Sequence, residues 1–475
     1  MKKLSVIIAF VFLVLSLTSC EKEFLEVSRL KSYSDNTYYL DITLDDDLDK
    51  LTIEGSIVYI NDKIDFDEIY LTLFSNAYNR DSETEDNVVF EYLKINDIDY
   101  NIEFSGVDNT SIHIDLEETL KEGKNHLIEF KYDVKYWDLG RFGKLDDDYY
   151  ITMFFYPYVS VYDEFGWNIE PYTFKGESYY NEIGDYYVKL NIPDDYLVAC
   201  SGEVIKEEIL EDGTKDIYYT LENGRDFSFS ASTDYYHYER LVDDVTFEIY
   251  ALGELTLLER NHSFDYLEQA FSVYSGIIGE YDYNHFTLEY GLIYGMESTG
   301  VIYCSREIDE GTVVHEVIHQ WFYSMIGNDQ SDYSFIDESL TTFSTGFYYN
   351  EIYGQEASDE FYYIRSSYRP DIFHHFEISE GTDMLRKVDE YGDEYAYIIY
   401  YHGVSMFKYY IDYFLDGDYE LFKTFMHAYY ETYKHEVVTL DQFLNLLEET
   451  TQVEDTYEWF MLMLNEFQHV YNMPE

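Results

Sequence analysis

Two histidines four positions apart lie in the apolar segment VVHEVIHQWF, Val313 to Phe322, and a glutamate directly follows the first of them. On a helix, His315 and His319 would share one face, because four residues make slightly more than one turn. Neutral imidazoles at that spacing can both ligate one Zn²⁺, and Glu316 then points toward the open coordination position. The alternative is a core helix that carries two hydrogen-bonded histidines.

A third candidate ligand follows on the next predicted helix. Eighteen residues separate His319 from Glu338, which lies in FIDESLTTF. Two histidines and one glutamate, with water in the fourth position, form the donor set of a catalytic zinc site. The apolar residues that flank Glu338 favour a ligand over a solvated carboxylate. We therefore expect one Zn²⁺ per chain.

The first half of the chain is predicted to be mostly β-structure. Apolar and polar residues alternate in short runs that are separated by Asp, Asn and Gly, as in half-buried antiparallel strands. Such runs are YYLDITL (38–44), SIHIDL (111–116), YVKLNI (187–192) and FSFSA (227–231).

Helical spacing replaces this alternation in the second half. The segment 263–279 has apolar residues at helical intervals, the strand-like FTLEYGLIYG (286–295) follows, and most long segments after Glu310 are helical. Thr439 and Gln442 have the spacing of a helix capping box. The predicted layout is a signal peptide at 1–20, a linker at 21–36, a β domain at 37–250 and a catalytic domain at 251–475.

The spacing HExxH-x18-E resembles that of the aminopeptidase N family of gluzincin zinc metallopeptidases. Two further segments are similar to motifs of this family. YGMESTGVIY, Tyr294 to Tyr303, resembles the GAMEN segment, which runs along the cleft as an edge strand. IIYYHGVSMF, Ile398 to Phe407, resembles the segment in which a catalytic tyrosine precedes a Lys-Gly pair by two residues. The stretches YPYVSVYDEFGW and GRDFSFSAS are similar to the family's N-terminal β domain.

The resemblance implies an α+β fold, with an N-terminal antiparallel, saddle-like β domain followed by a thermolysin-like, mainly α catalytic domain. It implies that Glu297, with Gly295 and Met296 in the same segment, binds the substrate and holds its free α-amine. It implies that Tyr400 donates a hydrogen bond to the oxyanion.

The chemistry implied is zinc-assisted hydrolysis of peptides. With zinc on His315, His319 and Glu338, Glu316 takes a proton from the attacking water and later delivers it to the leaving amine. The neighbouring Tyr401 leaves open a register shift by one residue.

Three departures from the family pattern bear on specificity. Ser298 replaces the asparagine of GAMEN, His402 replaces the lysine of the Lys-Gly pair, and we expect no C-terminal helical domain, which would leave a more open cleft. An endopeptidase of the same gluzincin type therefore remains an alternative to an aminopeptidase. A surface peptide-binding lipoprotein with an idle zinc site is a second alternative.

The composition argues against nucleic acid as a partner. Asp and Glu total 96 against 30 Lys and Arg, a formal net charge of −66, whereas phosphate binding needs basic patches. The three cysteines, Cys20, Cys200 and Cys304, are too few for a disulfide scaffold, and we expect the last two to be buried free thiols. Nothing in the sequence indicates an oligomeric state.

The first twenty residues, MKKLSVIIAFVFLVLSLTSC, predict export and lipid attachment. Lys2 and Lys3 form a basic n-region, and the apolar run Val6 to Leu15 is short for a membrane span. LTSC resembles a bacterial lipobox, in which cleavage leaves Cys20 as a lipid-bearing N-terminus. We therefore expect an extracytoplasmic protein that is anchored to the cell membrane by lipid on Cys20.

Overall fold

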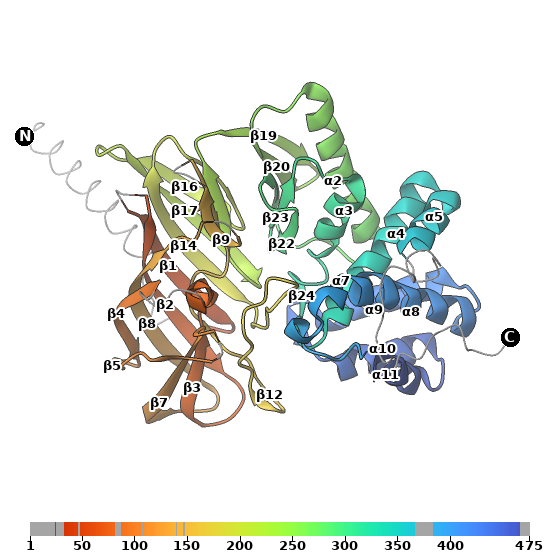
Figure 1. Ribbon diagram of the computed structural model, residues 1–475, viewed down its shortest axis with the longest axis horizontal. Helices are drawn as coiled ribbons and strands as arrows, with labels where there is room; N and C mark the ends of the chain where they lie inside the picture. Colours follow the sequence, from red (N-terminus) through yellow and green to blue (C-terminus); the bar gives the residue numbers. More distant parts are fainter. Residues whose placement is uncertain are drawn as a thin grey trace, which may run out of the picture.

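The structure, a computed structural model, describes residues 24, 33–45, 48–80, 87–106, 108–138, 140–145, 148–365 and 383–465. Strands of the N-terminal half lie on one side of the molecule and the helices of the C-terminal half on the other (Figure 1). The α+β prediction is confirmed. The predicted signal peptide, Cys20 and most of the predicted linker lie outside the described residues.

The largest sheet of the β domain has eight strands in the order β16-β17-β14-β1-β2-β8-β4-β5. Its pairs are antiparallel, except that β1 and β14 run parallel. The bounds are β1 Asn36–Leu44, β2 Lys50–Asn61, β4 Val88–Ile95, β5 Ile98–Asp99, β8 Lys124–Lys135, β14 Gly184–Pro193, β16 Glu203–Ile209 and β17 Thr214–Gly224. Strand β1 contains the predicted run 38–44, and its Leu40, Ile42 and Leu44 are buried, as their alternation indicated.

Two four-stranded sheets and a hairpin complete the β domain. Their orders are β15-β18-β10-β9 and β11-β3-β7-β6, and β12 pairs with β13. The bounds are β3 Phe66–Thr72, β6 Phe104–Ser105, β7 Ser111–Leu120, β9 Phe142–Leu145, β10 Tyr149–Thr152, β11 Tyr158–Val159, β12 Tyr162–Asp163, β13 Gly166–Trp167, β15 Leu197–Cys200 and β18 Phe229–Ser232, with a 3₁₀ turn η1 at Phe74–Arg80. Cys200 and Cys304 are buried free thiols.

A five-stranded sheet, β19-β20-β21-β23-β22, lies between the β domain and the helices (Figure 1). Its strands are β19 Tyr235–Val242, β20 Val245–Leu252, β21 His285–Gly291, β22 Gly295–Ser298 and β23 Val301–Ser305. Strand β20 pairs in parallel with β21, so β19 and β20 belong to the sheet of the second unit. The predicted β domain at 37–250 includes both strands, because alternation carries no information on which sheet a strand joins.

Helices make up most of the remaining chain. Their bounds are α2 Leu257–Ile277, α3 Glu310–Ile318, α4 Leu340–Tyr353, α5 Gln355–Arg365, α7 Tyr395–Tyr397, α8 Gly403–Tyr409, α9 Tyr419–Tyr433, α10 Leu440–Thr451 and α11 Thr456–Asn465. Single turns of π-helix occur at η2 Phe335–Ser339, η5 Ile398–His402 and η6 Tyr410–Phe414, and 3₁₀ turns at η3 Val388–Glu390 and η4 Gly392–Glu394. The predicted capping box of Thr439 and Gln442 starts α10. Over the described part of the chain, no helix combines the length and the apolar composition needed to cross a membrane.

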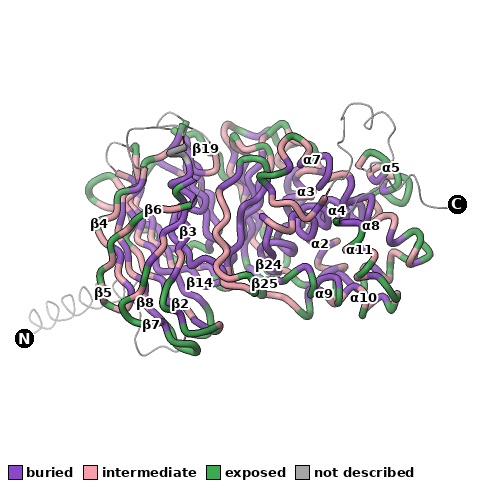
Figure 2. Tube along the Cα trace, turned by 60° about the horizontal axis from the view of Figure 1, so that its bottom comes forward, coloured by how far each residue is buried: buried purple, intermediate pink, exposed green. Residues whose placement is uncertain are grey.

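Buried contacts join the two units. Figure 2 shows buried segments in the β sheets as well as in α3, α4 and β24, Ile326–Asn328, which pairs with β25, Glu436–Val438. Arg225, which is completely buried, follows β17 and donates hydrogen bonds to the carbonyl oxygens of Asn328 and Tyr179. Its guanidinium also lies 5.1 Å from the ring centre of Tyr323. These contacts fix the β domain against the loop that follows α3.

Candidate active site

Helix α3 carries the two histidines, and their arrangement follows the predicted spacing. The helix starts at the side chain of Asp309, which accepts a hydrogen bond from the Thr312 backbone N–H. His319 directly follows the last helical residue and keeps helical backbone angles, φ −61° and ψ −11°. The Nε2 atoms of His315 and His319 therefore come within 3.2 Å of each other.

Glu338 meets both histidines from the π-helical turn η2. Its Oε2 lies 3.0 Å from Nε2 of His315 and 3.6 Å from Nε2 of His319. One ligand atom from each of the three residues lies within 4.8 Å of the others. A π-helical turn widens the helix locally and is frequent at functional sites. Two imidazole nitrogens and one carboxylate oxygen are the donors that a catalytic zinc ion takes.

The second nitrogen of each histidine faces the protein, and this also fits zinc. Nδ1 of His319 lies 3.2 Å from Oδ1 of Asp337 and 3.2 Å from the carbonyl oxygen of Phe322. Nδ1 of His315 lies 3.5 Å from Oγ1 of Thr342. The carbonyl and carboxylate oxygens favour the His319 tautomer in which Nε2 has a free lone pair, as metal-ligating histidines require, and the Thr342 hydroxyl can accept a hydrogen bond from His315 in the same tautomer.

Strand β22 places Glu297 beside Glu316. Because side chains alternate along a strand, Gly295 and Glu297 face α3, while Met296 and Ser298 face the opposite side. The Cβ of any larger residue at position 295 would lie 2.5 Å from Oε1 of Glu316, so glycine lets the two elements touch. Carboxylate oxygens of Glu297 and Glu316 and a nitrogen of His319 all lie within 4.8 Å of one another.

Met296 and Ser298 lie on the face of β22 that points away from α3. Met296 is 2% exposed and belongs to the hydrophobic core. The Ser298 hydroxyl donates to the carboxylate of Asp226 and lies 2.6 Å from the Ser228 hydroxyl, both in the β domain. Ser298, which replaces the asparagine of the family motif, therefore ties the edge strand to the β domain.

Tyr400 lies in a second π-helical turn, η5, beside the histidines. Its ring centre is 5.9 Å from that of His315, whereas Tyr401 stacks on Tyr397. A Cβ at Gly403 would collide with the side chain of Ser339, so this glycine lets η5 and η2 approach each other. Burial, reinforced by the nearby Glu338 carboxylate, keeps the pKa of Tyr400 well above its usual value, so the hydroxyl remains a proton donor at neutral pH.

Known proteins match both the motif region and the whole fold. Residues 293–469 match the model of the Peptidase family M1 domain. Residues 293–469 are a peptidase family M1 domain. The M1 zinc metallopeptidase of Deinococcus radiodurans superimposes with a TM-score of 0.65 at 14% identity, over 93% of this chain and 94% of that one.

Two mutant structures of the Deinococcus M1 enzyme are similar to the same extent. A glutamate-to-alanine mutant gives a TM-score of 0.65 at 13% identity, over 93% of this chain and 96% of that one. The mutant bound to Tyr-Ser-Ala gives 0.64 at 13% identity with the same coverage. At these identities the similarity shows the fold. No curated protein matches the chain in sequence.

The β domain adds two residues to the M1 site that the sequence pattern did not indicate. Nη2 of Arg141 donates to Oε1 of Glu177 at 2.8 Å, and Nη1 donates to the Gly176 carbonyl oxygen and to the Tyr179 hydroxyl, each at 3.1 Å. Oε2 of Glu177 is buried and has no hydrogen-bond partner among the described residues. Burial raises the pKa of Glu177, Arg141 opposes this, and Glu297 and Glu338 are near enough to raise it further.

Three more residues of the M1 domain belong to this neighbourhood. Asp337 is hydrogen-bonded by Gln330, whose amide also contacts Glu297. The ring centre of Tyr395 lies 6.0 Å from that of Tyr400. The ring of Tyr395 also packs so close to Gly176 of the β domain that a Cβ at this position would collide with it. The position of Asp337 next to Glu338 was the one sequence signal that could have indicated a role. His402 is buried outside the ligand set, and the neighbouring pair His374 and His375 lies outside the described residues.

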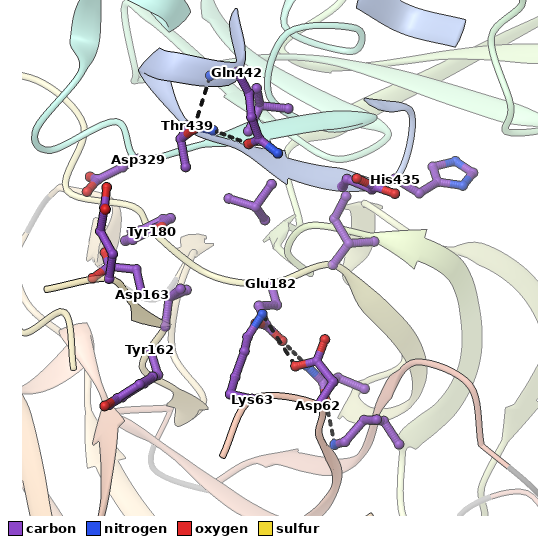
Figure 3. A pocket seen from close by; sticks show the side chains of 18 of the residues that line it. Asp62, Lys63, Tyr162, Asp163, Tyr180, Glu182, Asp329, His435, Thr439 and Gln442 are labelled. Carbon is purple, nitrogen blue, oxygen red and sulfur yellow. Dashed lines mark hydrogen bonds and ion pairs between the residues drawn. The ribbon is translucent and has the colours of Figure 1, made fainter. Parts of the chain in front are cut away.

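A separate cavity of 640 Å³ lies at the junction of the β domain and the M1 domain (Figure 3). Figure 3 shows Lys63 paired with Glu182 and Asp62 on one wall, and Thr439 capping α10 on another. Its lining residues are rich in carboxylates, and the three candidate zinc ligands are not among them. The reaction site is therefore assigned by its donor atoms and not by cavity size.

Replacing the Tyr400 hydroxyl gives the first test of this geometry. We expect Tyr400→Phe to lower kcat by about a hundredfold or more, because one donor to a developing oxyanion typically contributes that much. Zinc content should stay the same, since Tyr400 is not in the ligand set. Tyr401→Phe is the matched control, and a larger loss of kcat in that variant than in Tyr400→Phe would place the oxyanion donor one residue later.

Proposed function

We propose that the protein is an aminopeptidase that removes N-terminal residues from peptides. One observation carries the proposal, namely the distance between Glu297 and the zinc site. The Glu297 carboxylate lies within 4.8 Å of a ring nitrogen of the zinc ligand His319 and of the Glu316 carboxylate. Successive Cα atoms are about 3.8 Å apart, so a free amine held by Glu297 leaves room for about one residue before the scissile bond.

The negative charge around Glu297 suits a cationic amine. Glu297 is 2% exposed, and the free oxygen of Glu177 adds a second carboxylate from the β domain. A peptide's α-amine is cationic near neutral pH and would form charge-assisted hydrogen bonds with these groups. The Deinococcus mutant binds the substrate Tyr-Ser-Ala, and we propose short peptides with a free N-terminus as substrates here.

Glu316 and Tyr400 supply proton transfer and oxyanion stabilisation in the proposed reaction. Zinc supplies Lewis-acid polarisation of the scissile carbonyl and activation of water. Glu316 accepts a proton from that water and returns it to the leaving amine. Burial raises the pKa of Glu316 well above its usual value, which suits a group that must both take up and release a proton. The Tyr400 hydroxyl donates a hydrogen bond to the developing oxyanion.

Paired peptides test the aminopeptidase assignment. We expect a peptide with a free N-terminus to be cut at least tenfold faster than its N-acetylated twin, because the acetylated peptide leaves Glu297 buried without a charged partner. Glu297→Ala should remove most of that difference by slowing the free peptide, with zinc content unchanged. Rates would be compared by mass spectrometry of the products. Equal cutting of the acetylated twin at an internal bond would show an endopeptidase instead.

We also propose that the enzyme is held outside the cell by lipid on Cys20. The support is the sequence alone, with its basic n-region, short apolar run and LTSC at the cleavage site. We expect Cys20→Ser to accumulate as unprocessed or released protein, because serine has no thiol that could form the thioether to the lipid. Membrane fractionation with immunoblotting would measure this. Wild-type processing and membrane partition in the variant would refute the anchor.

A further inference from the structure

A single buried amide connects the substrate end of the cleft to the zinc end. Gln330 lies two residues after β24 and is completely buried. Its Nε2 donates to Oε1 of Glu297 at 3.0 Å and to Oδ2 of Asp337 at 2.6 Å. The adjacent Asp329 lines the cavity of Figure 3, whereas Gln330 does not, so the two side chains lie on different sides of the loop.

The two acceptors belong to different parts of the site. Glu297 is the carboxylate to which we assign the peptide's α-amine. Asp337 lies behind a zinc ligand, because its other oxygen is 3.2 Å from Nδ1 of His319. Within the described residues, the amide of Gln330 is the only side chain that donates a hydrogen bond to Glu297.

Glutamine suits this position in both charge and geometry. Two buried carboxylates near each other repel, and each needs a hydrogen-bond donor. The terminal NH₂ of glutamine offers one N–H to each, while its Oε1 is buried and has no partner among the described residues. Glutamate would add a third carboxylate, methionine would offer no donor, and asparagine would be one methylene shorter.

We propose that Gln330 is a positioning residue that fixes the carboxylates of Glu297 and Asp337 relative to each other. It would thereby couple recognition of the peptide's amine to the orientation of the zinc ligand His319. Its bond to Glu297 fixes the carboxylate before the amine arrives, which lowers the entropy lost on binding. Its bond to Asp337 fixes the partner of the His319 ring, a contact that tunes metal affinity. The first half of this inference rests on the proposed aminopeptidase function, and the second half does not.

The test uses two substitutions of nearly equal size, Gln330→Met and Gln330→Glu. Zinc affinity would be measured by competition with a chelator of known affinity. KM and kcat would be measured at saturating zinc on a free peptide and on its N-acetylated twin. Gln355→Met is the matched control, because Gln355 is an exposed glutamine that bonds Asp359 on the surface of α5. Circular dichroism would confirm that each variant is folded.

We expect zinc affinity to fall by about tenfold in both variants, the lower end of the effect of changing a partner behind a ligand, because Asp337 remains but loses the amide that orients it. We expect KM for the free peptide to rise about tenfold or more while kcat changes less, because a charge-assisted bond to the amine-binding group is lost. Gln330→Glu should be the more impaired of the two. The control should match the wild type in every measurement.

Two results would overturn the coupling. One is wild-type zinc affinity in folded Gln330→Met, and the other is wild-type KM for the free peptide in the same variant. If the wild type itself shows no preference for a free amine, the aminopeptidase proposal fails. In that case unchanged zinc affinity in the variants still refutes the role of Gln330 behind His319. A fall in zinc affinity would confirm that role alone, and the coupling to amine recognition would be refuted. Should Gln330→Met not fold, the isosteric Gln330→Glu decides by the same criteria.

Discussion

Glu316→Gln should abolish peptide hydrolysis while leaving one zinc ion bound per chain. The amide keeps the size of the side chain and its place against Gly295, but it cannot accept a proton from water. General acid–base catalysis typically contributes a factor of about 10²–10⁴, and Glu316 would act both as base and as acid. We expect kcat to fall by about that factor or more. Elemental analysis of the purified variant would confirm that its zinc content is normal.

Glu307→Gln is the matched control for this experiment. Glu307 is an exposed acid a few residues before α3, so the same change in charge should leave kcat unaffected. Full activity in Glu316→Gln would remove Glu316 from the mechanism. Loss of zinc in the same variant would instead make Glu316 part of the metal site.

Replacement of His319 should have the second large effect, through loss of the metal. The ring is completely buried between Asp337, Phe322 and the other ligands, so alanine removes a donor and leaves Asp337 without its partner. We expect His319→Ala to contain no zinc after dialysis and to have no measurable activity. Zinc that binds only the native state raises the Tm by mass action, so added zinc should raise the Tm of the wild type and not of the variant.

His262→Ala is the control, because His262 is exposed on α2. It should retain zinc, activity and the rise in Tm. Full zinc content in His319→Ala would refute the ligand set of His315, His319 and Glu338. Chelation of the wild type should abolish activity, and added zinc should restore it.

Local spacing carried enough information to predict the centre of the site. His315, Glu316 and His319 lie on one turn of a helix, so their geometry follows from helical periodicity alone. Glu338 needed one further assumption, that the next helix returns to the first. Tyr400 and Glu297 were predicted from resemblance to a family, and the structure brings both beside the histidines.

The residues that were missed come together only through the tertiary fold. Arg141 and Glu177 lie 36 positions apart in a turn and a loop of the β domain, more than a hundred residues before α3, and no periodic pattern marks either of them. Gln330 lies in a loop whose path depends on β24 pairing with β25, which is over a hundred positions further along the chain. Likewise, the predicted β domain ran to residue 250, and alternation could not show that β19 and β20 pair into one sheet with β21, β22 and β23.

The pairing of Arg141 with Glu177 has a consequence for modularity. A gene fragment that starts near Tyr235 would encode all three zinc ligands, Glu316 and Tyr400. It would not encode Arg141 and Glu177, which the β domain adds beside the site. It would also lose Arg225, whose guanidinium holds the loop before η2 through the Asn328 carbonyl. The second unit would therefore not form the complete site without the β domain. Any rotation of one unit against the other would change the separation of Glu177 and Glu297, which are near enough to interact electrostatically, so the peptide specificity would depend on both units.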